Sequence, residues 1–200
     1  MSNWRVTSEC AQFSTADGSR HRTDDRSARF RLRRQEHGHA GTVNSPSSSP
    51  RSTTSGTPTP TSPALPAAAE GITITSADAF ARFYLQVIDY AAATGDVTLL
   101  VQSSDKGCIS CDELSRHYSS VYKAGGSLTG DFRSRNVKST GVRLNGTKAA
   151  EITLSSTEGR HTLKPSATAK PTLFTGEAVD WTLTLANQSG QWVMYEIVQK

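Results

Sequence analysis

The stretch TSADAFARFYLQVIDYAAATG, residues 75–95, decides the fold of this chain. Its apolar residues recur at i, i+3, i+4, i+7, i+8 and i+11, which is the spacing of one face of an α-helix. They are Phe80, Phe83, Tyr84, Val87, Ile88 and Ala91. Thr75 followed by Asp78 is typical of a capping box, and Gly95 is typical of a helix end. A face this apolar needs a sheet or further helices to cover it.

Two shorter helices are predicted to follow the first one. Asp96 can cap a helix over residues 97–102, because a carboxylate accepts hydrogen bonds from the first free backbone N–H groups. Ser110 with Glu113 three residues later predicts a second capping box, which opens a helix that reaches about Ala124.

The apolar period then changes from 3.6 to 2, which indicates strands. We expect strands over residues 132–142, 148–155, 161–163, 173–174, 179–186 and 191–199. Asn145-Gly146 is a strong hairpin signal between the first two. The last strand is apolar on both faces, so we expect it to be central and covered on both sides. Helices followed by such a meander predict an α+β fold, in which three N-terminal helices pack in a strongly curved antiparallel sheet of four or more strands.

The first third of the chain has a different composition. Residues 1–65 contain nine Arg, no Lys and five acidic residues, whereas residues 66–200 contain thirteen basic and thirteen acidic residues. The net charge of +4 therefore lies entirely in the first third, and the balanced remainder argues against a nucleic-acid surface. We predict a disordered basic arm over 1–43, a Ser/Thr/Pro-rich tether over 44–66, and a cone-shaped domain over 67–200.

The folded part resembles the nuclear-transport-factor-2-like fold and, more narrowly, an uncharacterised family of actinobacterial envelope proteins, many of them lipoproteins. The resemblance covers residues 63–200 and rests on four stretches: PALPAAAE (63–70), AFARFYLQVIDYAAATGD (79–96), CISC (108–111) and WTLTLANQSGQWVMYEIV (181–198). It implies an extracytoplasmic or cell-envelope location.

One feature of that family is missing. Its members begin with a signal peptide that ends in a lipid-bearing Cys just before the tether. Here no apolar run lies near Met1, and Cys10 does not match the lipidated position, so a cytoplasmic location stays open. An Arg-only, Ser- and Gly-rich start is what GC-rich DNA encodes in a wrong frame. We therefore hypothesise a frameshift upstream of Ser45.

Cys108 and Cys111 form a C-x-x-C motif with the clearest chemical content in the chain. In an exported protein such a pair closes readily into a disulfide, and this is the pairing we expect. A redox-active pair and a zinc site are the alternatives. The βαβ context of thioredoxin motifs is missing, and only His117 and His161 offer further ligands, neither at ligand spacing. No metal and no cofactor is predicted.

Aromatic residues are the candidates for ligand binding. Cones of the fold named above often open into a pocket between the first helix and the curved sheet, and five residues could line it: Tyr84, Phe174, Trp181, Trp192 and Tyr195. A filled core is the favoured alternative, because a domain of this size accommodates five large aromatic residues.

Acid–base candidates are fewer. Two pairs could perform acid–base chemistry: His117 near Glu113 on one helix, and Asp180 with Glu196 on neighbouring strands. Each pair is explained more simply as solvated surface groups. Asp89 lies off the apolar stripe, and we expect it to be solvated as well.

The sequence thus predicts a protein of unknown function, a noncatalytic envelope-associated module that binds a small apolar ligand or a protein partner. The first alternative is an isomerase- or dehydratase-like enzyme on the same fold, which requires an open pocket with a carboxylate or His of raised pKa at its base. The second is a thiol redox protein that uses Cys108 and Cys111. No transmembrane segment is predicted, and the oligomeric state stays open.

Overall fold

A computed structural model of the chain describes residues 60–146 and 148–200. The predictions for the basic arm, for Cys10 and for most of the tether lie outside these residues. Within them, no helix combines the length and the apolar character needed to cross a membrane.

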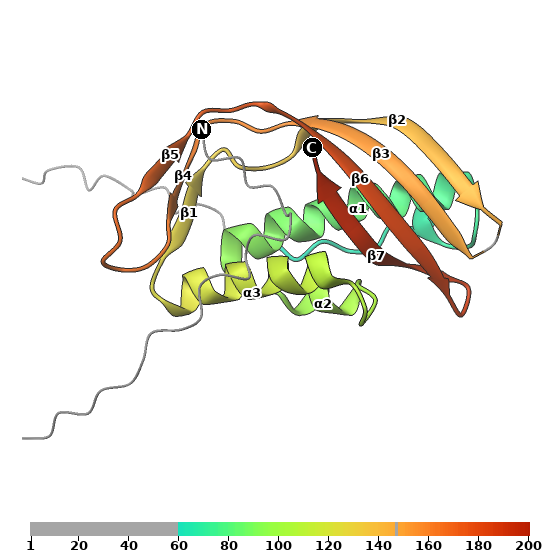
Figure 1. Ribbon diagram of the computed structural model, residues 1–200, viewed down its shortest axis with the longest axis horizontal. Coiled ribbons are helices and arrows are strands. Elements are labelled where there is room, and N and C mark those ends of the chain that lie inside the picture. The colour runs from blue at the N-terminus through green and yellow to red at the C-terminus, as the bar shows by residue number, and fades with distance from the viewer. Residues whose placement is uncertain (1–59, 147) are drawn as a thin grey trace, which may run out of the picture. The chain divides into compact units, whose positions relative to one another are not determined.

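The helices lie together on one side of the fold, below the curved sheet in Figure 1. A 3-10 turn, η2 (Ala67–Ala69), precedes the long helix α1 (Ile74–Thr94). The short helix α2 (Thr98–Gln102) and then α3 (Ile109–Lys123) follow, in the order that the sequence predicts.

The start of α1 differs from the prediction. The capping box is formed by Thr73 and Ser76 and not by Thr75 and Asp78. Ser76 N–H donates to Thr73 Oγ1 at 3.0 Å, and Thr73 N–H donates to Ser76 Oγ at 2.9 Å. Asp78 is held instead by Arg82, one turn later, at 2.8 Å. Since both pairs have suitable spacing, the choice depends on where the chain turns into the helix.

The strands form two antiparallel sheets. The larger has the order β2-β3-β6-β7 and contains β2 (Arg135–Asn145), β3 (Ala149–Thr157), β6 (Ala178–Gln188) and β7 (Gln191–Gln199). The smaller has the order β1-β4-β5 and contains β1 (Ser127–Gly130), β4 (His161–Lys164) and β5 (Thr172–Phe174). The larger sheet curves over α1 (Figure 1), so the predicted α+β class, with helices packed against antiparallel strands, is confirmed.

A corner joins the two sheets. The chain passes from β3 into β4 through residues 158–160 and from β5 into β6 through residues 175–177 (Figure 1). Glu158 N–H donates to the Glu177 carbonyl at 2.9 Å and ties the two crossings together. Gly176 is needed at this approach, because a Cβ there would overlap the carbonyl oxygen of Glu158.

The prediction that β7 is a central strand is wrong, since β7 lies at the edge of its sheet. Thr184 pairs with Glu196 and Leu185 with Met194, so Tyr195 is an extra, bulged residue. The bulge reverses which side chains face inward and makes both faces look apolar in the sequence. The connection between α2 and α3 covers this edge: Met194 N–H donates to Ser103 O at 2.9 Å.

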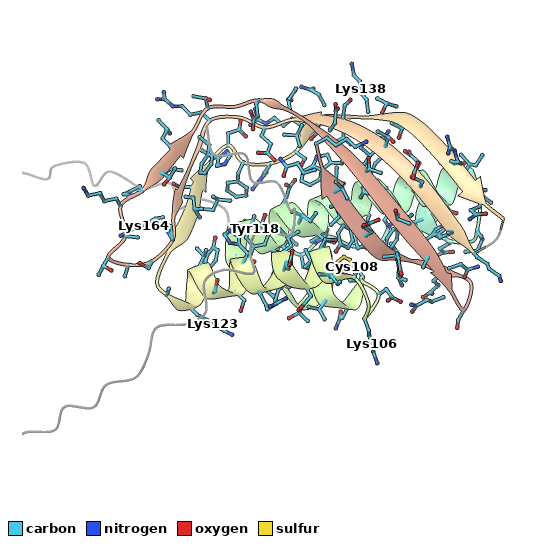
Figure 2. All side chains as sticks on the ribbon, viewed as in Figure 1. Lys106, Cys108, Tyr118, Lys123, Lys138 and Lys164 are labelled. Carbon is cyan, nitrogen blue, oxygen red and sulfur yellow. A yellow bond between two sulfur atoms is a disulfide. The ribbon has the colours of Figure 1, made fainter. Side chains whose placement is uncertain are left out.

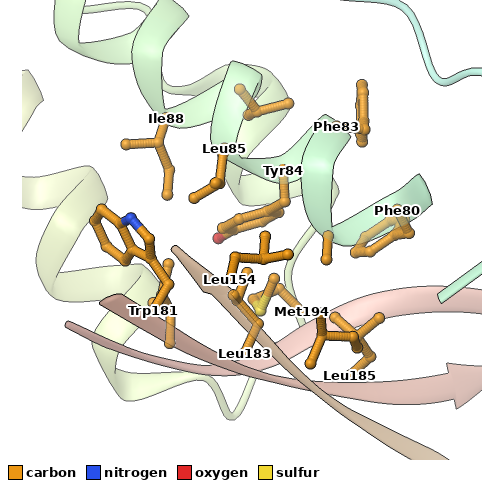
Figure 3. Close-up of a cluster of buried hydrophobic side chains, with 14 of the residues drawn as sticks. Phe80, Phe83, Tyr84, Leu85, Ile88, Leu154, Trp181, Leu183, Leu185 and Met194 are labelled. Atoms are coloured by element: carbon orange, nitrogen blue, oxygen red, sulfur yellow. The ribbon is translucent and has the colours of Figure 1, made fainter. Parts of the chain in front are cut away.

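The main core lies between α1 and the larger sheet. Figure 3 shows Tyr84 and Leu85 of α1 against Leu154, Leu183 and Met194 of the strands, and all five are at most 1% exposed. Each such side chain contributes roughly 1.5–3 kcal/mol through its burial. The apolar stripe of residues 80–91 is therefore covered as predicted.

Candidate functional site

A cavity of about 600 Å³ lies between α1, α3 and the corner of the two sheets. The residues that line it come from both helices, from the smaller sheet, from the start of β6 and from the end of β7. The cavity therefore adjoins the filled core, and Ile88, Trp181 and Ile197 belong to both.

The walls are largely aromatic and aliphatic. Four large apolar side chains line this space: Leu114 and Tyr118 of α3, Phe174 of β5 and Trp181 of β6. Tyr118 is labelled in Figure 2. The imidazole of His161 stacks on the ring of Phe174, with centroids 5.0 Å apart and planes 14° from parallel. An apolar cavity with a few polar groups is the usual character of a small-molecule site.

Asp89 is the first of these polar groups, and the prediction that it is solvated is wrong. Burial raises the pKa of its carboxyl to about 7, although the Ser134 backbone hydrogen bond and the positive charge of Arg133 act in the opposite direction. Ser134 N–H donates to both carboxylate oxygens at 3.2 Å. The segment between β1 and β2 folds back over α1 at this point, and a helical period cannot reveal such a cover.

Glu158 and Glu177 add two more carboxyl groups to the cavity wall at the corner. Burial raises the pKa of Glu158, the neighbouring charge of His161 lowers it, and the charge of Glu177 raises it further. Neither residue stands out as a candidate in the sequence. A signal was available in the sequence: Glu158-Gly159 and Gly176-Glu177 each place a glycine beside a carboxylate just outside a strand. Such pairs are consistent with a tight corner that bears carboxylates.

The side chains of α3 respond to the same surroundings. The pKa of the Tyr118 hydroxyl is raised strongly by burial, and the negative charges of Asp89 and Glu158 raise it further. Burial lowers the pKa of His117, which favours the neutral imidazole at pH 7. Both residues line the cavity.

The five predicted pocket residues lie in different places. Phe174 and Trp181 line the cavity. Tyr84 is fully buried in the core, where its hydroxyl lies 2.8 Å from Ser104 Oγ. Trp192 is also in the core and donates from Nε1 to Ser76 Oγ at 3.1 Å. Tyr195 is 51% exposed, because it is the bulged residue of β7.

The predicted carboxylate pair is not brought together. Asp180 and Glu196 are both exposed, and the register pairs Asp180 with Ser155 and Glu196 with Thr184. Glu113 does not line the cavity that His117 faces.

The two cysteines of the C-x-x-C motif lie at disulfide distance, with Cα atoms 5.3 Å apart and both side chains 2% exposed. Cys108 is the N-cap of α3, and its Sγ accepts a hydrogen bond from Cys111 N–H at 3.2 Å. The predicted cap Ser110 instead accepts Ile197 N–H from β7 at 3.1 Å. The motif therefore fixes the start of α3 against the edge strand.

Metal binding finds no support in residues 60–146 and 148–200, where no group of three or more His, Cys, Asp and Glu side chains is arranged to hold an ion. The two cysteines lie at the start of α3, and neither lines the cavity.

Comparison with known proteins gives a family and a fold. Residues 52–198 match a family of unknown function, DUF6318. The intermembrane space region of the chloroplast protein ARC6 is similar in structure, with a TM-score of 0.51 and 10% identity, over 63% of this chain and 95% of that one. An NTF-2-like protein of unknown function from Shewanella oneidensis MR-1 has a TM-score of 0.37 and 14% identity, over 62% and 98%. No curated protein matches the chain significantly.

Proposed function

The chain belongs to the DUF6318 family of unknown function, and from this premise we propose that it is a noncatalytic module that binds a small, largely apolar molecule. The ligand occupies the cavity between α1, α3 and the sheet corner. One observation carries the proposal: a space of about 600 Å³ persists in a domain whose other end is filled by side chains. This volume falls in the range of about 300–1,000 Å³ that is typical of ligand sites.

The proposal includes a location outside the cytoplasm, in association with the cell envelope. The Cys108–Cys111 pair at disulfide distance supports it, because such bonds persist in oxidising compartments. The Ser/Thr/Pro-rich composition of residues 44–66 supports it too, since tethers of this kind hold a domain away from a surface.

The enzyme alternative requires an open pocket with a carboxylate or His of raised pKa, and Asp89 has that property. A buried carboxylate also serves to anchor a ligand, so this observation does not favour catalysis over binding. The redox alternative requires reactive free thiols, whereas Cys108 and Cys111 are buried and at disulfide distance.

A titration with N-phenyl-1-naphthylamine tests the proposal, because this neutral dye fluoresces in apolar sites and is smaller than the cavity. We expect one dye per chain to bind with a clear rise in emission. Leu163→Trp adds bulk to the cavity wall from β4 and is expected to weaken binding at least about tenfold, since the larger ring occupies ligand space.

Leu173→Trp is the matched control, because it makes the same change on β5 at a residue that is 52% exposed and does not line the cavity. This variant is expected to bind the dye as the unchanged protein does. Absence of dye binding, or equal loss in both variants, would overturn the proposal.

A further inference from the structure

We infer that the ligand carries a positively charged amine on a compact apolar body. The inference rests on the proposed function, because it names the class of molecule that the cavity binds. It is carried by the charges and the rings that line the cavity.

The cavity wall has an excess of negative charge. Asp89 from α1 and Glu158 and Glu177 from the corner contribute three carboxyl groups, against the single ammonium of Lys200. In the described part of the chain, the ion pairs within 4 Å join other acids, namely Asp78, Asp112 and Asp131. The cavity carboxylates thus have no Lys or Arg partner at that distance among these residues.

These carboxyl groups act on one another. The charge of Glu158 raises the pKa of Asp89, and the charge of Glu177 raises the pKa of Glu158, in each case after burial as the largest cause. The charge of Arg133 opposes the effect of Glu158 on Asp89 in part, whereas the charge of His161 acts on the pKa of Glu158 more strongly than the charge of Glu177 does. Asp89 and Glu158 are partly buried and Glu177 is exposed. Partial burial of like charges is unfavourable without a counter-charge, and a ligand cation supplies one.

Asp89 keeps acceptor capacity for such a cation. Its two oxygens accept from the Ser134 backbone N–H, and Oδ1 also accepts from the Ser134 hydroxyl at 3.5 Å, whereas a carboxylate offers about four lone-pair positions. An ammonium group that donates to the remaining positions forms charge-assisted hydrogen bonds, which are roughly twice as strong as neutral ones.

The aromatic walls suit the same ligand. Tyr118, Phe132, Phe174 and Trp181 line the cavity, and a cation over the face of an aromatic ring is attracted by its quadrupole. An anion would face three carboxyl groups and the electron-rich faces of these rings. A divalent metal finds no group of three suitable ligands among the described residues.

The test uses three probes with one apolar body and different charges: 3-phenylpropylamine, 3-phenylpropanol and 3-phenylpropanoate. Each is titrated into the full chain at pH 8 by isothermal calorimetry, where the amine is a cation and Asp89 is mostly ionised. We expect the amine to bind about tenfold or more tightly than the alcohol, and the carboxylate to bind weakest, because a charge-assisted contact of about 1.5–3 kcal/mol is added for the amine alone.

Two variants locate the effect. Asp89→Asn and Glu158→Gln keep the side-chain shape and remove the charge, so each is expected to reduce amine affinity several-fold and to leave alcohol affinity unchanged. Asp180→Asn is the control, since Asp180 is exposed on β6 and does not line the cavity. Unchanged alcohol binding also shows that each variant is folded with its cavity intact.

The outcomes separate the two proposals. If the alcohol and the amine bind equally well, or if the two charge-removing variants leave amine binding unchanged, the amine class is wrong while the binding function stands. If no probe binds at millimolar concentration and the neutral dye also fails to bind, both proposals are overturned.

Discussion

The two ends of α1 are used in opposite ways. Toward its start, Phe80 and Tyr84 pack into a core that the larger sheet closes, as Figure 3 shows. Toward its end, Ile88, Asp89 and Ala92 face a cavity that α3 and the sheet corner leave open. One continuous helix is thus packed into the core along its first half and lines a cavity along its second.

Polar groups show the same contrast. In the filled end, Tyr84 and Trp192 each have a partner at hydrogen-bond distance, Ser104 and Ser76 respectively. In the cavity end, burial raises the pKa values of Asp89, Glu158 and Tyr118, and the charges of neighbouring carboxylates raise them further. The polar groups of Tyr84 and Trp192 are thus satisfied by the protein itself, whereas Asp89, within the described part of the chain, accepts hydrogen bonds from Ser134 alone and keeps acceptor positions free.

The largest expected difference concerns apolar truncation. Leu183→Ala, in the filled end and 0% exposed, is expected to lower the free energy of unfolding by about 2–5 kcal/mol, because a new void forms. Leu114→Ala, at the cavity wall, is expected to cost only about 1 kcal/mol, since it enlarges an existing space. Urea unfolding measures both changes, and equal losses in the free energy of unfolding would contradict the difference between the two ends of α1.

The next effect is on the pH dependence of stability. The folded-state pKa of Asp89, about 7, lies above the ordinary value of 3.8, so the folded protein retains a proton that the unfolded chain releases. The contribution of Asp89 to the free energy of unfolding is therefore fully present below about pH 4. It is lost as the pH rises to about 7, by roughly 2–4 kcal/mol.

Asp89→Asn should remove that decline. The difference in pH dependence between the variant and the unchanged protein gives the contribution of Asp89, separately from those of the other titratable groups around it: Glu158, Arg133, His117 and Tyr118. Urea unfolding from pH 4 to pH 8 measures it. Asp180→Asn, at an exposed site, should leave the pH profile as it is. A profile unchanged by Asp89→Asn would mean that this carboxyl group is solvated.

Reduction of the Cys108–Cys111 pair has a smaller expected effect. Its loop is short, so the chain-entropy account gives a loss of about 2 kcal/mol in the free energy of unfolding. Amide hydrogen exchange with and without reductant should show the loss of protection first at the start of α3 and along β7, where Ser110 accepts from Ile197. Loss of protection in β2 and β3 first would contradict this.

The smallest effect separates two tyrosines. Tyr84→Phe removes the hydroxyl that pairs with Ser104 and is expected to cost about 1 kcal/mol of stability. Tyr118→Phe, at the cavity wall, should change stability by less than about 0.5 kcal/mol, because its hydroxyl makes no hydrogen bond to another described residue that the substitution would remove. Thermal unfolding compares the two, and a larger loss for Tyr118→Phe would reverse the contrast.

The sequence was informative where a period repeats. The stripe from Phe80 to Ala91 predicted α1 and its burial, and the alternation in β6 predicted its inward residues Trp181 and Leu183. The order of helices and strands followed from the change of period. These features are local, so local residue spacing is sufficient to specify them.

Long-range placement accounts for the differences. The bulge at Tyr195 depends on pairing with β6, and the burial of Asp89 depends on a segment 45 residues later that supplies Ser134. The strand β1, SLTG, is too short for an alternation to show. The corner at Glu158 arises only when two crossings meet. No spacing within one element contains this information.

The most direct test is an amide NMR titration of the labelled chain with 3-phenylpropylamine. The account predicts that the largest shifts occur at Asp89, Tyr118 and Glu158, with little change at Leu183, Leu185 and Met194. Largest shifts in that second group, or no shifts at all at millimolar amine, would contradict the claim that the far half of α1 lines a ligand site.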